Sequence, residues 1–269
     1  MHISLEFPKY LEPLARTKSS HIEVFSDFVR MSACALSAWT REEEYLEVAG
    51  KYKRPELDEI CKAFGSLNQQ MEEEPFEDLL GQYYTETAAK ATRDGRGEFY
   101  TPPEISQLMA ILAFRADEII EKWEPVSVHE PACGSGGMIM QMAKQLAPKE
   151  DGAPSYVDLM RVTAIDISPT ACDMAHINFT SWGIPSHIIH GNALSLEEWG
   201  SWKNIHWHRV WEDARRSLDN LKELISWASQ EMKTKPAAPF SGVSEISENP
   251  DYLLKKKETS SGQFEFDLE

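Results

Sequence analysis

The chain has 269 residues, of which 42% are hydrophobic and 10% aromatic, so it can bury a substantial core and extensive disorder is excluded. Its formal net charge of −17 argues against DNA binding over the whole surface, because contacts from Lys and Arg to phosphates dominate nucleic-acid affinity. DNA binding would need basic residues gathered on one face or a basic partner; an acidic surface could also imitate DNA. No apolar run approaches the length of a membrane span, and the N-terminus does not resemble a signal peptide, so we expect a cytoplasmic protein without a membrane partner.

The four cysteines are scattered and form no Cys-x-x-Cys pair, which is typical of reduced thiols rather than of a disulfide framework or a zinc site. His206 and His208 lie close together, but no third ligand accompanies them. The sequence therefore predicts no metal site.

A helical region is predicted over residues 1–92. Apolar residues recur at helical spacing within 20–50, again after Arg54 and Pro55, and a third time after the acidic run 72–74 and Pro75, where Phe76 is expected on the inner face of the helix. A loop rich in Gly and Pro follows over 91–103, before helical periodicity resumes at Glu104. Lys90, Arg93 and Arg96 form a basic cluster near this loop; they are candidates for phosphate contacts, and a solvated loop is an equal alternative.

Residues 126–137 predict a strand, a tight glycine turn and a helix. Glu130 ends the strand, and Gly134, Gly136 and Gly137 would let the backbone approach a ligand closely, because a Cβ at these positions would collide with it. The spacing matches neither Gly-x-Gly-x-x-Gly nor the phosphate-binding Gly-x-x-x-x-Gly-Lys-Ser/Thr loop.

A second strand, Val162–Asp166, also ends in an acid. In a dinucleotide fold such an acid binds the ribose hydroxyls; the alternative for Asp166 is an acid at a helix N-terminus. A helix begins at Ser168 and ends near Gly183, and a third strand is predicted over 184–189.

The string Glu130-Pro-Ala-Cys-Gly-Ser-Gly-Gly137 resembles the S-adenosylmethionine loop of the N6-adenine DNA methyltransferases, especially the modification subunits of type I restriction systems. Residues 97–102, Gly-Glu-Phe-Tyr-Thr-Pro, are similar to a second cofactor motif of that family, and 78–84 look like the helix that precedes its cofactor domain. The resemblance covers roughly residues 76–196. It implies an α/β fold, with an incomplete Rossmann-like methyltransferase sheet behind a helical N-terminal region.

The resemblance also implies cofactor contacts. Tyr100, Thr101 and Pro102 would border the methionine end, Asp166 would hold the ribose, and Ile167 would lie against the adenine. The acid that holds the adenine amino group in the family is replaced by Asn192, whose amide oxygen can still accept a hydrogen bond. The expected set is Tyr100, Thr101, Pro102, Glu130, Ala132, Cys133, Gly134, Gly136, Asp166, Ile167, Asn192 and Ala193.

The resemblance stops after the third cofactor motif. The Asn/Asp-Pro-Pro-Tyr/Phe tetrapeptide that holds the target base in amino-methylating enzymes is absent, and residues 199–211 occupy its place. The nearest string, 249–252, lies far downstream, so the catalytic residues are unknown. Five of the eight tryptophans fall within 199–227; they could stack on bases, but we expect them to cover an exposed sheet edge.

These features predict four parts: a helical region (1–92), an S-adenosylmethionine-binding domain (93–200), a Trp-rich helical segment (201–233) and a polar, flexible tail (234–269). Phe264, Phe266 and Leu268 alternate with acids, so Gln263–Leu268 could dock on a partner or pair with the incomplete sheet.

The expected function is that of a bacterial or phage restriction-modification protein, which binds S-adenosylmethionine and methylates adenine N6 in DNA. It would act alone or with a partner subunit that supplies the missing motif. The alternative is an inactive pseudo-methylase that regulates or blocks a modification complex.

Overall fold

The computed structural model describes residues 3–18, 20–38, 40–91, 101–149, 153–234, 256–258 and 264–266. Its chain forms two compact units, residues 1–217 and residues 218–269. The helix α10 (Ile205–Thr234) begins in the first unit, which also contains the predicted helical and cofactor regions.

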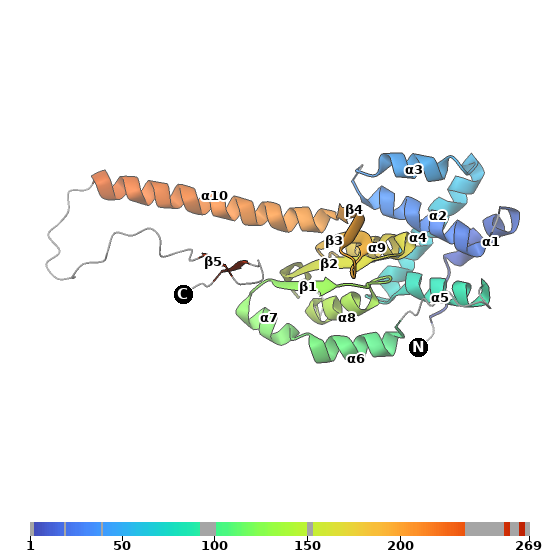
Figure 1. The fold of residues 1–269 in the computed structure, drawn as a ribbon, viewed down its shortest axis with the longest axis horizontal. Coiled ribbons are helices and arrows are strands. Elements are labelled where there is room, and N and C mark those ends of the chain that lie inside the picture. The colour runs from blue at the N-terminus through green and yellow to red at the C-terminus, as the bar shows by residue number, and fades with distance from the viewer. Residues whose placement is uncertain are drawn as a thin grey trace. The chain divides into compact units, whose positions relative to one another are not determined.

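The N-terminal region is helical, as predicted (Figure 1). Its helices are α1 (Pro8–Thr17), α2 (His21–Leu36), α3 (Glu42–Ala49), α4 (Arg54–Glu73) and α5 (Leu79–Ala91). Ser20 caps α2 by accepting a hydrogen bond from the backbone N–H of Glu23. The helix α1 was not predicted. Phe76 was expected in the third helix, but it precedes α5 in a turn with a φ of 62°, where its side chain is buried.

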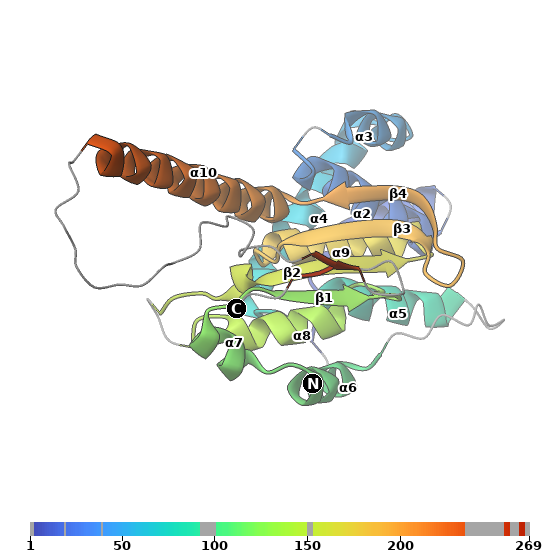
Figure 2. The same cartoon turned by 60° about the vertical axis from the view of Figure 1, so that its left-hand side comes forward.

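The strands form one four-stranded sheet in the order β1-β2-β3-β4 (Figure 2). The strands β1 (Val126–Glu130), β2 (Met160–Asp166) and β3 (Ser186–Asn192) are parallel, whereas β4 (Glu197–Lys203) runs antiparallel to β3. The helices α6 (Pro103–Ala113) and α7 (Ala116–Lys122) precede β1; α8 (Gly137–Leu146), the short 3-10 helix η1 (Val157–Leu159) and α9 (Pro169–Ser181) connect the parallel strands. The predicted α/β class is confirmed, and all three predicted strands are present, although the third lies over 186–192 and not over 184–189.

The strand β4 corrects the prediction for the Trp-rich segment. Trp199 and Trp202 were expected to cover a sheet edge, but both belong to a strand that itself forms the edge beside β3. Trp202 lies opposite Ile188 in the register. Gly191 permits this pairing at a register irregularity, because a Cβ there would overlap the carbonyl oxygen of Glu197.

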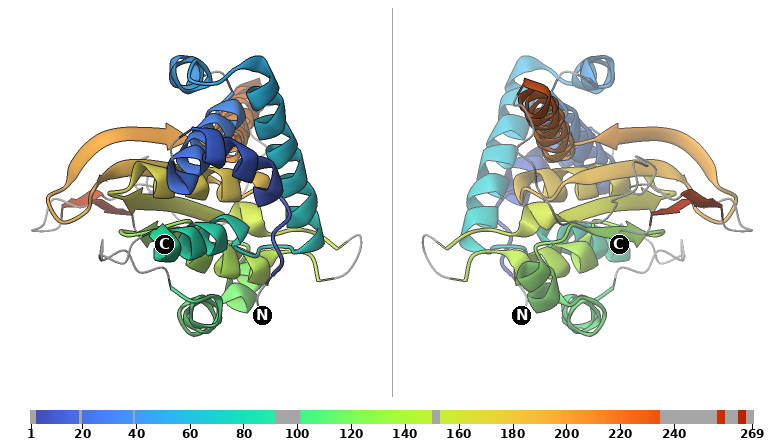
Figure 3. Two further views of the ribbon diagram at one scale, coloured as in Figure 1. Left: turned by 90° about the vertical axis from the view of Figure 1, so that its right-hand side faces the viewer. Right: turned by 90° about the vertical axis from the view of Figure 1, so that its left-hand side faces the viewer.

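Two hydrophobic cores meet at α9. The first lies among the N-terminal helices and includes Phe25, Phe28 and Met174; the second lies against the sheet and includes Ile139 and Phe179. Met174 and Phe179 both belong to α9, so this helix is buried between the N-terminal helices and the sheet (Figure 3).

Buried polar groups also join α9 to the N-terminal helices. Asp173 pairs with Arg30 and, at 2.9 Å, with Arg41. The Nε2 atom of His176 lies 3.0 Å from Ser37 Oγ. Burial, with a smaller contribution from Arg41, lowers the pKa of His176 to about 4, so this side chain is neutral at physiological pH.

In the second unit, β5 (Lys256–Glu258) pairs antiparallel with β6 (Phe264–Phe266). Residues 249–252 and Leu268 lie outside the described residues, and docking of the tail stays a prediction. Among the helices in the described ranges, none combines the length and apolar character needed to cross a membrane.

Candidate cofactor site

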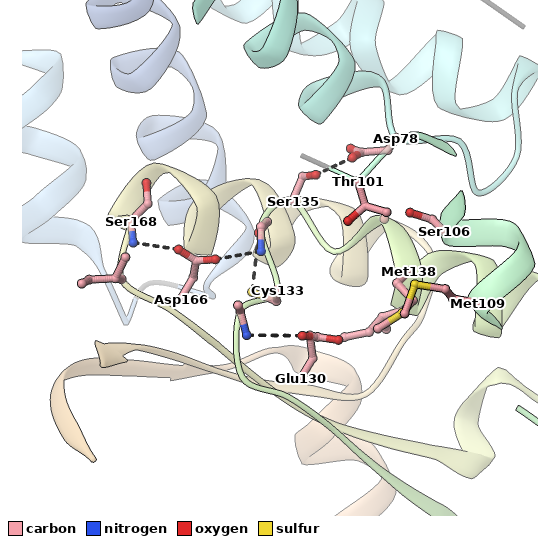
Figure 4. Close-up of a pocket in the computed structure, with 15 residues that line it drawn as sticks. Asp78, Thr101, Ser106, Met109, Glu130, Cys133, Ser135, Met138, Asp166 and Ser168 are labelled. Atoms are coloured by element: carbon pink, nitrogen blue, oxygen red, sulfur yellow. Dashed lines mark hydrogen bonds between the residues drawn. The ribbon is translucent and has the colours of Figure 1, made fainter. Parts of the chain in front are cut away.

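A cavity of about 450 Å³ lies at the carboxyl ends of β1 and β2 (Figure 4). This is the edge at which ligands bind in open parallel sheets. The lining residues come from the turn before α5, from α6 and the residue pair before it, from the end of β1, the glycine loop and the start of α8, and from the end of β2 with the two residues after it. They are Asp78, Thr101, Ser106, Met109, Glu130, Ala132, Cys133, Gly134, Ser135, Gly137, Met138, Ile139, Asp166, Ile167 and Ser168.

The glycine loop lies between β1 and α8, and its shape requires glycine at two positions. Gly134 has a φ of 54° and Gly136 a φ of 89°, in the left-handed region. A Cβ on Gly136 would also overlap the ring of Phe179 on α9. We predicted that these glycines let the backbone approach a ligand closely. At Gly136, the group that the backbone approaches closely is the side chain of Phe179.

Asp166 holds this loop from the end of the neighbouring strand. Its Oδ2 accepts a hydrogen bond of 2.8 Å from the Gly134 N–H, and its Oδ1 accepts one of 2.8 Å from the Ser168 N–H. The side chain of Ser168 accepts a bond from Ala171 N and so caps α9. Asp166 thus borders the cavity, as the ribose role requires, and also lies just before a helix, as the alternative proposed.

Glu130 is half-buried at the end of β1. Its Oε1 atom accepts a hydrogen bond of 3.3 Å from the N–H of Ala132. Burial raises the pKa of Glu130, and the nearby negative charge of Asp166 raises it further. A cationic ligand group at this place would relieve both effects.

The structure brings together seven of the twelve predicted cofactor residues. Thr101, Glu130, Ala132, Cys133, Gly134, Asp166 and Ile167 line the cavity. Pro102 lines an adjoining cavity of about 280 Å³, which Thr101 and Ser106 share. Gly136 belongs to the glycine loop but packs against the ring of Phe179 and does not line the cavity. Tyr100 lies outside the described residues.

Asn192 and Ala193 are not among the residues that line the cavity. The Oδ1 atom of Asn192 accepts hydrogen bonds from the N–H groups of Leu194 (2.9 Å) and Ser195 (3.3 Å). The amide oxygen that was expected to bind an adenine amino group therefore shapes the turn between β3 and β4.

Sequence reasoning missed several lining residues, above all Asp78, Ser106 and Ser135. Asp78 accepts a hydrogen bond from Ser135 Oγ in the glycine loop. The one available signal was an acid at the start of the string 78–84; the observed α5 begins directly after it, so Asp78 also has the ordinary position of a helix cap. A role of Asp78 in the cavity could be inferred only from its contact with Ser135, which joins two parts of the sequence that are far apart.

The other predicted candidates lie elsewhere. Arg93 and Arg96 fall outside the described residues, as does the side chain of Lys90. His206 Nε2 lies 2.9 Å from the carbonyl oxygen of Thr180. Within the ranges that the structure describes, no group of three or more His, Cys, Asp or Glu side chains could hold a metal ion.

Comparison with known proteins identifies related chains. The family described as N-6 DNA Methylase matches residues 75–225. The type I restriction enzyme MpnII methylase subunit of Mycoplasma pneumoniae is 29% identical over 192 residues, which cover 68% of this chain and 31% of that protein. The chain therefore spans about a third of the length of this curated relative.

Two solved structures are similar over part of the chain. A putative class I S-adenosylmethionine-dependent methyltransferase from Listeria monocytogenes has a TM-score of 0.40 and 18% identity, covering 70% of this chain and 53% of that one. The methyltransferase subunit of a type I restriction-modification system from Streptococcus thermophilus has a TM-score of 0.36 and 16% identity, covering 74% and 42%.

Proposed function

The chain belongs to the N-6 DNA methylase family, and we propose that it binds S-adenosylmethionine in the cavity at the ends of β1 and β2 and takes part in methylating adenine N6 in DNA. Residues 93–200 would form the cofactor-binding domain. The protein would work in the bacterial cytoplasm, encoded by a bacterium or a phage.

The observation that carries this proposal is the charge of the cavity. Among the described residues, the 15 that line it include three carboxylates, Asp78, Glu130 and Asp166, and no Lys, Arg or His. Such a site favours a ligand with positive groups and disfavours a polyphosphate. S-adenosylmethionine has an ammonium and a sulfonium group, and it supplies an electrophilic methyl group on the sulfonium sulfur.

The lining residues suit the rest of the cofactor as well. Asp166 has the position to accept hydrogen bonds from ribose hydroxyls, and Ile167 follows it with a largely exposed side chain that could cover the adenine. Met109 and Met138 add flexible apolar side chains to the wall. Glu130 would hold the ammonium group, which would favour its charged form.

Calorimetric titration tests the cofactor assignment. S-adenosylmethionine and S-adenosylhomocysteine should both bind, methylthioadenosine should bind more weakly because it lacks the amino-acid ammonium group, and ATP should not bind. Gly134→Asp and Asp166→Ala should each abolish detectable binding while the fold is retained. Unchanged affinity in both variants would refute the site.

The target-binding motif is the part that a partner, or sequence beyond this chain, would supply. Within the described residues, β1 pairs along one side only, with β2. Val126 and Val128 on β1 are half-buried, whereas Val162 and Ala164 on β2 are fully buried. A strand at the edge of a sheet has unpaired N–H and C=O groups, so the free edge of β1 is a place where a further strand could add.

Apolar side chains beside this edge support the same proposal. The helix α6 exposes Ile105, Leu108, Met109, Ile111 and Leu112, although its opposite side packs on the second core through Ala110. The charged residues that follow, in and after α7, are mostly acidic: Asp117, Glu118, Glu121 and Glu124, with Lys122 as the one basic residue among 116–125. A segment that covered this region would therefore be apolar at its centre and basic at its rim. A basic subunit would also add phosphate contacts, which the net charge of −17 makes unfavourable over most of this chain.

Transfer of a labelled methyl group to adenine-containing DNA tests this second part. The chain alone should bind the cofactor and transfer no methyl group, and a cognate basic subunit should restore transfer. Robust transfer by the chain alone would show that the target motif is present in a form that the sequence does not reveal, with residues 199–211 as the first place to look.

The alternative is a pseudo-methylase that binds the cofactor and regulates or blocks a modification complex. The absence of Asn/Asp-Pro-Pro-Tyr/Phe from the sequence and the acidic charge favour it. In that case the chain should inhibit, rather than restore, methyl transfer when it is added to an active complex.

A further inference from the structure

Asp78 lies in the turn before α5, where the helical region meets the glycine loop and α9. Resting on the proposed cofactor binding, we propose that Asp78 is a positioning residue: it fixes the glycine loop in its cofactor-binding shape and so makes cofactor affinity depend on the helical N-terminal region. No motif identified in the sequence assigns this role to Asp78.

The contacts of Asp78 form a closed network. Its Oδ2 accepts the hydroxyl hydrogen of Ser135, and its Oδ1 accepts hydrogen bonds from the Gly81 N–H (2.9 Å) and the Asn178 side-chain amide (3.2 Å). The same Asn178 amide donates to the carbonyl oxygen of Ser135 at 2.8 Å. Ser135 is therefore held through both its side chain and its backbone, and each bond leads to Asp78 directly or through α9.

Both oxygens of Asp78 act as acceptors, Oδ1 for two N–H groups and Oδ2 for the Ser135 hydroxyl. An asparagine could keep its oxygen toward the two N–H groups, but its NH₂ group would then face Ser135 Oγ, which would have to accept instead of donating, and the charge-assisted bond to Ser135 would be replaced by a neutral one. The Ser135 hydroxyl hydrogen would lose its acceptor, and a buried polar group left without a partner destabilises this arrangement of the loop. The loop would then relax away from the arrangement that Asp166 stabilises from the opposite side through Gly134.

The fit between α5 and the loop is also sterically specific. A Cβ on Gly81 would overlap both Asp78 Oδ2 and Ser135 Oγ, and a Cβ on Gly137 would lie 3.4 Å from Asp78 Oδ2. The helix thus approaches the loop at a glycine, and the cavity wall includes Asp78 for the same reason.

Separate contacts keep the turn in place without Asp78. Phe76 stacks on Trp182 with ring centroids 4.5 Å apart, and its carbonyl oxygen accepts a hydrogen bond of 3.0 Å from Gln141. Glu77 forms an ion pair with Lys144 of α8 at 2.7 Å. A substitution at Asp78 should therefore disturb the loop more than the fold.

The test compares Asp78→Asn, Ser135→Ala and the double variant with Glu77→Gln, a matched control that also neutralises one carboxylate and breaks a contact between this turn and the α8 region. Calorimetry gives the Kd for S-adenosylmethionine, thermal unfolding gives Tm, and hydrogen exchange of the amides of residues 133–136 is followed without cofactor. We expect Asp78→Asn to raise Kd at least tenfold and to speed exchange of the loop amides. The double variant should have a Kd within about twofold of that of Asp78→Asn, because the two substitutions break the same contact, between Ser135 and Asp78. The Kd of Glu77→Gln should stay within about twofold of that of the unsubstituted chain.

Three results would overturn the inference: an unchanged Kd for Asp78→Asn, a lower Tm with unchanged Kd and loop exchange, or fully additive effects of Asp78→Asn and Ser135→Ala. Failure of the unsubstituted chain to bind S-adenosylmethionine would instead remove the proposed function. The exchange of the loop amides in Asp78→Asn would still decide whether Asp78 holds the loop.

Discussion

Two carboxylates bind the helical region to the rest of the first unit, and they do so by different means. Asp173, on α9, faces two guanidinium groups, those of Arg30 and Arg41. Asp78, at the cavity, has hydrogen bonds from a hydroxyl, an amide side chain and a backbone N–H, with no cation among these partners. Burial is the main reason why the pKa of Asp78 is raised, and its hydrogen bonds oppose that effect.

The difference separates stability from ligand binding. At the Asp173 end, opposite charges neutralise one another, and the guanidinium of Arg41 also lies 4.1 Å from the ring centroid of Trp202 on β4. That end fixes α2, α9 and β4 together. At the Asp78 end, negative charge is left facing the cavity, where a cationic ligand can compensate it.

The largest effect on stability is expected from Asp173→Ala. It leaves Arg41 buried with only Glu44 as an acidic partner, and breaking a buried ion pair from one side costs about 3–5 kcal/mol. Urea unfolding should show this loss, while the cofactor Kd of the folded protein stays within about twofold. A loss below about 1 kcal/mol would contradict the distinction between the two ends.

The second-largest effect on stability is expected from acidification, which should destabilise the contacts around Asp173 because His176 becomes protonated on unfolding. The folded protein holds this imidazole neutral with a pKa of about 4, whereas the unfolded chain has the ordinary value near 6.5. Between these values the unfolded state binds more protons, so the free energy of unfolding should fall as pH falls, by about 3 kcal/mol over the whole window.

Unfolding of the unsubstituted chain and of His176→Asn at pH 6.5, 5.5 and 4.5 measures this term. Other groups contribute to both curves, and the difference between their slopes isolates His176. His21→Gln, at the exposed start of α2, is the control. Parallel curves for His176→Asn and the unsubstituted chain would show that this histidine does not set the pH dependence.

Gly136→Ala should disturb the cavity end by about 1–3 kcal/mol, because the new Cβ would overlap Phe179 at a position with a φ of 89°. Tm should fall and the cofactor Kd should rise together. Gly136→Ala combined with Phe179→Leu should recover part of the Tm if the ring overlap dominates, and none if the backbone strain does.

The smallest stability effect is expected from Gly81→Ala. Alanine favours the helix by about 0.5–1 kcal/mol, and overlap with Asp78 and Ser135 opposes that gain, so Tm should change little while Kd rises severalfold. Gly65→Ala, in α4 with open space around the new Cβ, should show the helical gain alone and leave Kd unchanged. Equal changes of Tm and Kd in the two variants would mean that the close contact of Gly81 with Asp78 and Ser135 does not affect cofactor binding.

The sequence predicted the parts of the site that follow from local patterns. Glu130 and Asp166 could be found because each ends a β-branched run, and parallel strands bring their carboxyl ends to one edge. The strand, turn and helix around Gly134 have a local cause, the alternation of apolar runs with glycine. The resemblance to the methyltransferase family then identified S-adenosylmethionine as the expected ligand.

The parts that were missed depend on tertiary contacts or on ambiguous patterns. Asp78 becomes part of the cavity only because α5 packs beside the glycine loop, which no spacing in the sequence reports. The strand β4 reads Glu-Glu-Trp-Gly-Ser-Trp-Lys, and its exposed pattern lacks the apolar alternation of a half-buried strand. Asn192 was assigned to the adenine site because of its place in the order of the family motifs. In the structure its side-chain oxygen instead accepts a hydrogen bond from the N–H of Leu194, in the turn that follows it.

The double burial of α9 has a consequence for how the chain unfolds. Because Met174 and Ile177 face one core while Cys172, Ala175 and Phe179 face the other, α9 cannot lose either partner without exposing apolar surface together with Asp173 or Asn178. The helical region and the parallel sheet should therefore melt in one cooperative step, with the amides of α9 exchanging only through global opening. A fragment that begins at residue 101 would lack the first core, so we expect it to be unstable although it keeps most of the residues that line the cavity.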